Sequence, residues 1–198
     1  MQYTNFDWVD DQLAVGGLVS EPEVLPFDAI LSMTPDAPTT VRPLVTGGNV
    51  EYRWFSIIDG YSHEEHDEIV NRYNLAVAQL DQWVREGKRV LIHCHAGISR
   101  SATAVVWYLV NYRGMSWDEA HALVRQGRQK ARPNIRFEVP LRMSLGEWFS
   151  DEQLEEMARA YCDRIWEDEG ISIPPGEIMD DLKRQGTLDR LHALAPTG

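Results

Sequence analysis

Cys94 and Arg100, six positions apart, have the residue types and spacing needed for chemistry on an oxyanion. A short, β-branched apolar run at residues 89–92 precedes them, as is typical of a buried strand. A long apolar run without glycine or proline follows at residues 102–112, as is typical of a helix. The connecting loop therefore opens a helix. Its unpaired N–H groups and the helix dipole favour an anion such as phosphate.

The same surroundings favour the thiolate form of Cys94, which predicts a nucleophile. Arg100 adds a permanently charged, planar fork that matches two phosphoryl oxygens, and lysine lacks this geometry. Ser101 follows directly and can donate a hydrogen bond to the sulfur. The predicted phosphate-binding residues are His95, Ala96, Gly97, Ile98, Ser99 and Arg100.

Residues 93–101, His-Cys-His-Ala-Gly-Ile-Ser-Arg-Ser, resemble the signature of the dual-specificity branch of the cysteine-based protein tyrosine phosphatases. Residues 54–59 resemble the family's strand leading into an aspartate loop. The segment Pro133-Asn134-x-x-Phe137-x-x-x-Leu141 resembles its Pro-Asn-x-x-Phe-x-x-Gln-Leu element, with Pro140 in place of the glutamine. The resemblance implies an α/β fold, a short mixed sheet flanked by helices, and phosphomonoester hydrolysis without a cofactor.

Attack of a thiolate on phosphorus needs an acid opposite the nucleophile, because a bare alkoxide or phenolate leaves poorly. Asp59 follows an apolar strand and precedes Gly60 at the start of a loop, which makes it the best candidate. The resemblance points to the same residue. We expect Asp59 to act first as acid and then as base towards water, with Ser101 stabilising the departing thiolate. Glu65 is less suited, because Ser62 and Glu65 form a predicted capping box.

The histidines near the loop and near Asp59, and the second cysteine, have structural interpretations. His93 and His95 could bind a metal, but the pair lacks a further Cys/His cluster, so we predict no metal site and expect His93 to hydrogen-bond the loop. His63 and His66 are predicted to be solvated. Cys162 is predicted to be a small buried apolar residue on a helix. The resemblance gives Asn134 a supporting role.

Composition narrows the class of protein. The net charge of −12 argues against a nucleic-acid or anionic-membrane binder. Two cysteines, no signal-like start and no apolar run near the length of a membrane span predict a protein of the reducing cytoplasm.

A basic segment covers residues 125–142, where six basic residues face one acid, Glu138. Helix C-termini favour such residues, so half of them are expected to be merely solvated. Arg128, Lys130 and Arg132 are the candidates to border the phosphate site and attract anionic substrates.

The expected elements are strands at residues 8–17, 28–33 and 50–58, and an amphipathic helix at residues 62–86 that Gly87 ends. Gly114 is expected to end the helix after the loop, and Ser116 with Glu119 to cap the next one.

We predict a catalytic domain at residues 1–148 and an acidic helical extension at residues 149–198, with two helices separated by Pro174-Pro175-Gly176. The extension could pack on the catalytic domain, which we favour, mediate dimerisation or bind a partner.

Substrate class is less well defined. Little chain separates the first strand from Asp59, so the pocket is expected to be shallow. The resemblance then implies phosphotyrosine, with possible phosphoserine and phosphothreonine, in proteins. A shallow basic site could also take an inositol phosphate, a phosphoinositide or a nucleotide.

A different class of function is a module that binds phosphorylated partners without turnover. Such modules typically lose the nucleophile, the arginine or the acid, and this chain keeps all three.

Overall fold

The computed structural model describes residues 5–18, 26–36, 50–59 and 64–195. Contacts divide the chain into two compact units, residues 1–59 with 72–133 and residues 60–71 with 134–198. The predicted boundary at residue 148 therefore falls inside the second unit.

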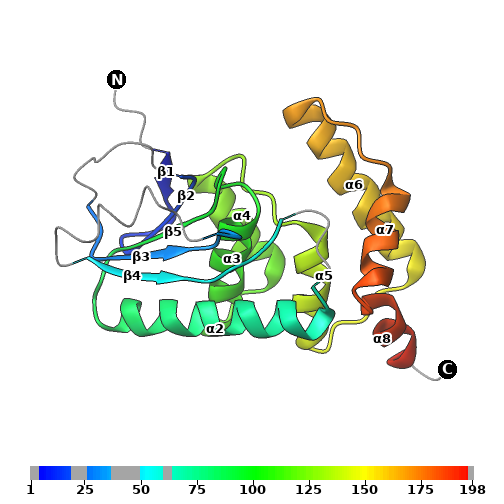
Figure 1. Cartoon of the computed structure of the whole chain (residues 1–198), viewed down its shortest axis with the longest axis horizontal. Coiled ribbons are helices and arrows are strands. Elements are labelled where there is room, and N and C mark those ends of the chain that lie inside the picture. Colours follow the sequence, from blue (N-terminus) through cyan, green and yellow to red (C-terminus); the bar gives the residue numbers. More distant parts are fainter. Residues whose placement is uncertain (1–4, 19–25, 37–49, 60–63, 196–198) are drawn as a thin grey trace. The chain divides into compact units, whose positions relative to one another are not determined.

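Among the described residues, the first unit contains a five-stranded mixed sheet in the order β1-β2-β5-β3-β4 (Figure 1). β1 and β2 are antiparallel, and the other neighbouring pairs are parallel. The bounds are β1 Phe6–Trp8, β2 Leu13–Gly16, β3 Ala29–Ser32, β4 Glu51–Trp54 and β5 Val90–His93. The predicted α/β class with a short mixed sheet is confirmed.

Two strand predictions need correction. Residues 8–17 are not one strand, because a turn separates β1 from β2. There the Asp10 carboxylate accepts hydrogen bonds from the N–H groups of Gln12 and Leu13, each at 2.8 Å. β4 ends at Trp54, and residues 55–59 leave the sheet towards Asp59.

β5 lies at the centre of the sheet, and its position decides where the loop begins. Its four residues are buried, and it pairs in parallel with β2 on one side and β3 on the other. His93 ends the strand opposite Gly16 and Ser32. Cys94 therefore starts a loop at the carboxyl ends of three parallel strands.

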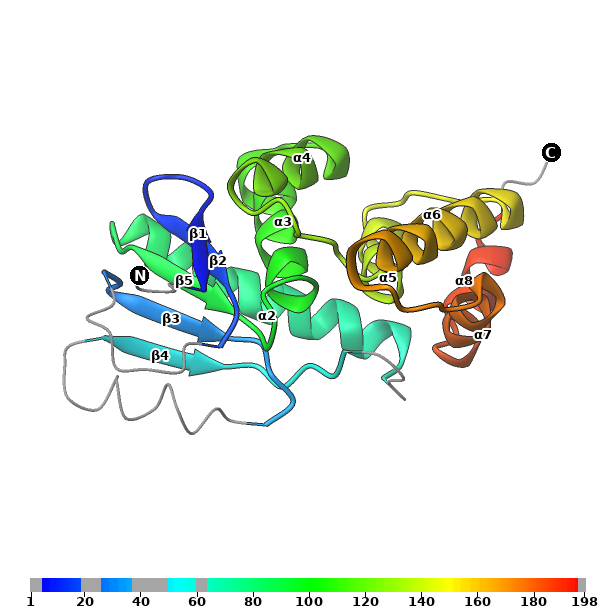
Figure 2. The same cartoon turned by 90° about the horizontal axis from the view of Figure 1, so that it is seen from above.

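Three helices accompany this sheet: α2 His66–Arg85, α3 Arg100–Arg113 and α4 Trp117–Gly127. From residue 72 onward α2 belongs to the first unit, where it runs along one face of the sheet (Figures 1 and 2). Gly114 ends α3 in the left-handed conformation at φ 68°, and Ser116 and Glu119 form a capping box at α4, so both predictions are confirmed. The expected start at Ser62 lies outside the described residues.

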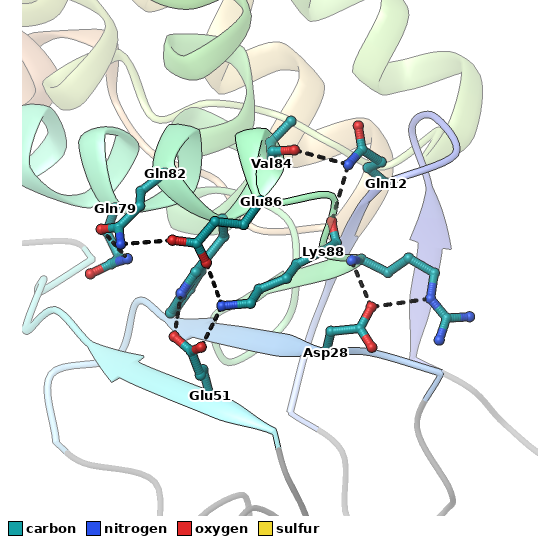
Figure 3. A network of polar contacts seen from close by, with 10 residues as sticks. Gln12, Asp28, Glu51, Gln79, Gln82, Val84, Glu86 and Lys88 are labelled. Atoms are coloured by element: carbon teal, nitrogen blue, oxygen red, sulfur yellow. Dashed lines mark hydrogen bonds and ion pairs between the residues drawn. The ribbon is translucent and has the colours of Figure 1, made fainter.

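A network of polar contacts surrounds residues 86–89, which precede β5 in the sequence (Figure 3). The network therefore lies at the end of the strand away from Cys94. Lys88 contacts the carboxylates of Glu51 and Glu86, and the Trp83 indole donates to Glu51 at 2.8 Å. The hydrogen bond from Lys88, followed by that from Trp83, lowers the pKa of Glu51. The backbone N–H of Arg89 donates to Asp28 at 2.9 Å and is the main cause of that carboxyl's lowered pKa. These contacts fix where β5 enters the sheet.

The second unit is helical, with α5 Ile135–Ser144, α6 Asp151–Glu169, α7 Pro175–Arg184 and α8 Thr187–Ala193. Up to residue 195, where the description ends, the extension holds three helices rather than the predicted two, because Gly186, at φ 72°, separates α7 from α8. Their apolar faces and α5 share one core. Its buried members are Ile135, Val139, Met143, Phe149, Leu154, Ala158, Cys162, Ile178, Leu182 and Leu191.

Cys162 is buried in this core, as predicted, and burial raises the pKa of its thiol. The prediction that His66 is solvated is wrong. His66 is 5% exposed and its Nδ1 lies 3.3 Å from the hydroxyl of Thr187. Burial, with a smaller effect of Arg190, lowers the pKa of His66. His63 lies outside the described residues.

Across the described part of the chain, every helix is too short or too polar to cross a lipid bilayer.

Candidate active site

The sulfur of Cys94 lies at the bottom of the loop between β5 and α3, where it accepts two hydrogen bonds. The N–H of Gly97 donates to Sγ at 3.2 Å, and the hydroxyl of Ser101 lies 3.3 Å from Sγ. The Ser101 hydroxyl also lies 3.2 Å from the carbonyl oxygen of Gly16. Cys94 is 1% exposed, so two donors and little water surround the sulfur. The two hydrogen bonds fix the position of the sulfur at the bottom of the loop.

Four consecutive carbonyls of the loop, those of residues 95–98, accept hydrogen bonds from outside it. Leu18 N–H donates to His95 at 2.9 Å, and Arg132 N–H donates to Ile98 at 2.8 Å. The guanidinium of Arg128 donates to the two carbonyls between them, those of Ala96 and Gly97. In a planar trans peptide the N–H points away from the C=O. The N–H groups of residues 96–99 therefore point to the other side, as that of Gly97 does towards the sulfur. The result is a concave set of donors suited to an anion.

Arg100 and Asp59 lie together beside this loop. Arg100 is the first residue of α3 and is 6% exposed, and its Nη1 donates to the carbonyl of Ile57 at 3.2 Å. Its Nε lies 3.3 Å from Asp59 Oδ2, and the hydroxyl of Ser99 donates to Asp59 Oδ1 at 3.2 Å. Ser99 occupies the N-cap position of α3 without capping it, because its side chain faces Asp59. The amides that open α3 are thus left for another acceptor.

His93 ends β5 and is fully buried, with Nδ1 3.3 Å from the carbonyl oxygen of Cys94. An acceptor at this distance requires the proton on Nδ1. Burial outweighs the favourable contact with that carbonyl and lowers the pKa of His93 to about 4. His93 is therefore neutral near pH 7, and its hydrogen bond to the carbonyl of Cys94 holds the start of the loop.

The basic residues predicted to border the phosphate site differ in placement. Lys130 is exposed, whereas Arg132 is buried and its N–H holds the loop at Ile98. Arg128 is 3% exposed and donates to the outer side of the loop. Its guanidinium therefore lies on the side of the loop opposite the N–H groups of Gly97 and Ile98. That Arg128, Lys130 or Arg132 attracts anionic substrates stays a prediction.

Asn134 belongs to the second unit, where its side chain accepts a hydrogen bond from the N–H of Arg136 at 3.0 Å and caps α5. His95 and Ala96 are exposed at the loop surface, Ile98 is half-buried, and Gly97 and Ser99 are buried.

Two glycines are essential to the shape of the site: Gly97, which was predicted to bind phosphate, and Gly17, which the sequence did not assign to the site. Gly97 has a φ of 69°, and a Cβ there would lie 2.4 Å from the carbonyl carbon of Gly16. A Cβ at Gly17 would lie 2.7 Å from the carbonyl oxygen of His95. The pair Gly16-Gly17 at the end of an apolar strand was the available signal, because such a pair lets a second backbone approach closely.

The described residues contain no group of three or more His, Cys, Asp or Glu side chains arranged to hold a metal ion. What they bring together is a buried cysteine sulfur, an array of inward N–H groups, the guanidinium of Arg100 and the carboxylate of Asp59. That set suits covalent catalysis on a tetrahedral oxyanion.

Comparison with known proteins agrees with this chemistry. Residues 16–144 match the family model described as dual specificity phosphatase, catalytic domain. The chain thus belongs to the dual specificity phosphatase family, within the cysteine-based tyrosine phosphatase superfamily, as its resemblance predicted.

Among its relatives is dual specificity protein phosphatase Mpk3 of Drosophila melanogaster, 31% identical over 128 residues that cover 61% of this chain and 29% of that protein. Dual specificity protein phosphatase 15 of Rattus norvegicus is 32% identical over 126 residues, covering 56% and 53%. This chain thus spans about half or less of the length of these two relatives. The crystal structure of Tk-PTP in the active form superposes with a TM-score of 0.60 at 26% identity, covering 73% of this chain and 97% of that one.

Proposed function

We propose that this protein hydrolyses phosphomonoesters through a phosphocysteine at Cys94. The observation that carries the proposal is the direction of the loop amides: the carbonyls of residues 95–98 are all held from outside, and the N–H of Gly97 points at the sulfur. A phosphoryl group placed above Sγ would meet these amides and the Arg100 fork together. Family membership supports the same reaction.

In the first step the Cys94 thiolate attacks phosphorus while the bond to the leaving oxygen breaks. Asp59 gives its proton to that oxygen, so an alcohol or phenol departs. Arg100 and the loop amides bind the three equatorial oxygens, whose charge they stabilise in the transition state. When the phosphate binds, Arg100 turns its donors to it, which releases Asp59 from the ion pair.

In the second step water attacks the phosphocysteine and the S–P bond breaks. Asp59, now a carboxylate, takes a proton from that water. Ser101 donates its hydrogen bond to the departing sulfur, from 3.3 Å. Inorganic phosphate leaves and the thiolate is restored.

We place phosphotyrosine in proteins first among substrates, with phosphoserine and phosphothreonine next. The names of the relatives, which are dual specificity protein phosphatases, support this order. So does the loop itself, because its variable positions hold His95, Ala96, Ile98 and Ser99 and no lysine. A panel of phosphopeptides, inositol phosphates, phosphoinositides and nucleotides ranked by kcat/KM would test it. A non-protein substrate at the head of that ranking would reverse the order.

Turnover of 4-nitrophenyl phosphate by the purified protein and by Cys94→Ser tests the mechanism. We expect the variant to lose at least about 10⁴-fold in kcat, since a nucleophile is removed outright. Cys162→Ser is the matched control, because it removes the other buried thiol. Turnover surviving in Cys94→Ser would refute a phosphocysteine. Phosphate binding without turnover by the wild type would favour the phospho-binding module.

We further propose that residues 1–148 form the catalytic region and residues 149–198 an accessory extension in a protein of the reducing cytoplasm. The extension's shared core with α5 supports packing within the chain rather than dimerisation or partner binding. The two free cysteines support the compartment.

A further inference from the structure

Arg128 makes an unusual set of contacts for a side chain that does not face the sulfur. Its Nη2 donates to the carbonyl oxygen of Ala96 at 2.9 Å, and its Nε donates to that of Gly97. On the outer side, Nη1 donates to the carboxylate of Asp7 at 2.7 Å and Nη2 to the side-chain oxygen of Asn5 at 3.1 Å. The guanidinium is thus held between the edge of the sheet and two successive peptides of the loop.

Those two peptides carry the N–H groups of Gly97 and Ile98. Because each peptide is planar, a donor that fixes the carbonyl oxygen also fixes the direction of the N–H on the other side. The N–H of Gly97 reaches the Cys94 sulfur at 3.2 Å. The N–H of Ile98 points to the same side, since its carbonyl partner is held by the same guanidinium.

We propose that Arg128 is a positioning residue for the phosphoryl group: it aims the amides of Gly97 and Ile98, and Asp7 holds it in place. The inference rests on the proposed function and deepens it. It assigns Arg128 the role of orienting the amides that bind the transition state, in place of substrate recognition. Because Asp7 belongs to β1, this strand also contributes to the geometry of the site.

The planar fork is required for this role. Two acceptors on adjacent residues are bridged by two nitrogens of one rigid group, which a single ammonium cannot reproduce. The fit is close, because a Cβ on Gly97 would lie 2.5 Å from Nη2 of Arg128. Asp7 balances the buried charge, which would otherwise be costly. Its carboxylate is 46% exposed, so it is the weaker part of the arrangement.

Arg128→Met, Arg128→Lys and Asp7→Asn test the proposal, with Arg125→Met as the matched control. Arg125 is an exposed arginine in the last turn of α4, and Arg128 is the residue that follows this helix. For each variant we would measure the melting temperature, kcat and KM with 4-nitrophenyl phosphate, and the inhibition constant of inorganic phosphate. A purely structural role would reduce the folded fraction and lower the apparent kcat, but it would leave the inhibition constant unchanged.

We expect Arg128→Met to lose about 10- to 100-fold in kcat/KM and to raise the inhibition constant of phosphate about tenfold, since misdirected donors bind the oxyanion less well. Arg128→Lys should fall between Met and wild type, because it keeps the charge and loses the fork. Asp7→Asn should raise the inhibition constant less than Arg128→Met does. It decides the matter if Arg128→Met does not fold.

Two results would overturn the proposal. The first is an inhibition constant of phosphate in Arg128→Met that equals the one in Arg125→Met; if Arg128→Met does not fold, Asp7→Asn takes its place in this comparison. The second is full activity in Arg128→Lys. Failure of the proposed function would look different, because wild type and Arg125→Met would then show no turnover at all. In that case the dissociation constant of inorganic phosphate, measured by calorimetry on the same variants, still tests the role of Arg128.

Discussion

The two units each bury an arginine against an aspartate, and they use the pair in different ways. In the first unit Arg128 donates to the side chains of Asp7 and Asn5 and to two carbonyls of the loop. In the second unit Arg136 pairs with Asp181, and both side chains are about 5% exposed. Asp181 also accepts from Arg184. This second pair joins α5 to α7.

The difference lies in what Arg128 touches besides Asp7, namely two carbonyls of the loop. A guanidinium that holds backbone carbonyls also fixes the direction of the N–H groups in the same peptides. A change in its position would therefore alter the hydrogen bonds to a reacting group. A pair that joins two helices controls only whether they stay together. The same interaction is therefore expected to govern activity in one unit and stability in the other.

Arg100→Lys is the strongest way to test the loop side of this contrast. We expect kcat to fall about 10³-fold with little change in melting temperature, because the ammonium cannot bind two phosphoryl oxygens as the fork does. Kinetics with 4-nitrophenyl phosphate and a thermal melt measure the two quantities. Arg125→Lys is the control, and a loss below tenfold would show that charge alone suffices at position 100.

Asp181→Asn tests the helical side. The change removes the negative charge of Asp181 from beside the buried Arg136, so the free energy of unfolding should fall by about 3 kcal/mol. Turnover at a temperature where the variant is folded should be unchanged. Urea unfolding measures the first quantity, with the exposed neighbour change Asp180→Asn as the control. A large loss of turnover in the folded variant would break the proposed division of roles.

Asp59→Asn sharpens the loop side, because its effect should depend on the substrate. Hydrolysis of phenyl phosphate should slow about 100-fold, since phenolate needs a proton to leave. Hydrolysis of 4-nitrophenyl phosphate, with its better leaving group, should slow much less. Equal losses on both substrates would remove Asp59 from the role of general acid.

The smallest predicted effect is the pH dependence of stability that His93 causes in the first unit. Its pKa is lowered to about 4 from 6.5, so the unfolded chain binds the proton more readily than the folded one between these values. The stability associated with neutral His93 is complete above pH 6.5 and is lost as pH falls towards 4. Between pH 7 and 5.5 the loss should be about 1 kcal/mol.

Urea unfolding of the wild type and of His93→Asn at both pH values measures this difference, because the variant lacks the titrating group. Equal pH dependence in the two proteins would contradict the burial of a neutral imidazole.

The sequence predicted the strand, loop and helix around Cys94 because local patterns specify them: a β-branched run, a glycine in the loop and an apolar helix. The capping box at Ser116 and the end of α3 at Gly114 were predictable for the same reason. The role of Arg128 was not, since it depends on which side of the loop the arginine approaches. That is set by packing of residues far apart in the chain.

The division of the extension was missed for a related reason. Leu182 and Leu188 fit one apolar stripe on paper, but the left-handed turn at Gly186 separates them into two helices. Glycine allows such a turn without requiring it. The burial of His66 was missed because its partner Thr187 lies at the other end of the unit's sequence.

The central place of β5 has a consequence for how the protein folds. The strand pairs with β2, near the start of the chain, and with β3, so the sheet that shapes the loop forms only through contacts distant in sequence. Such contacts form more slowly than helices, because long loops must close first. During refolding, helical signal should return before turnover does. The time at which activity recovers therefore reports when the sheet is complete.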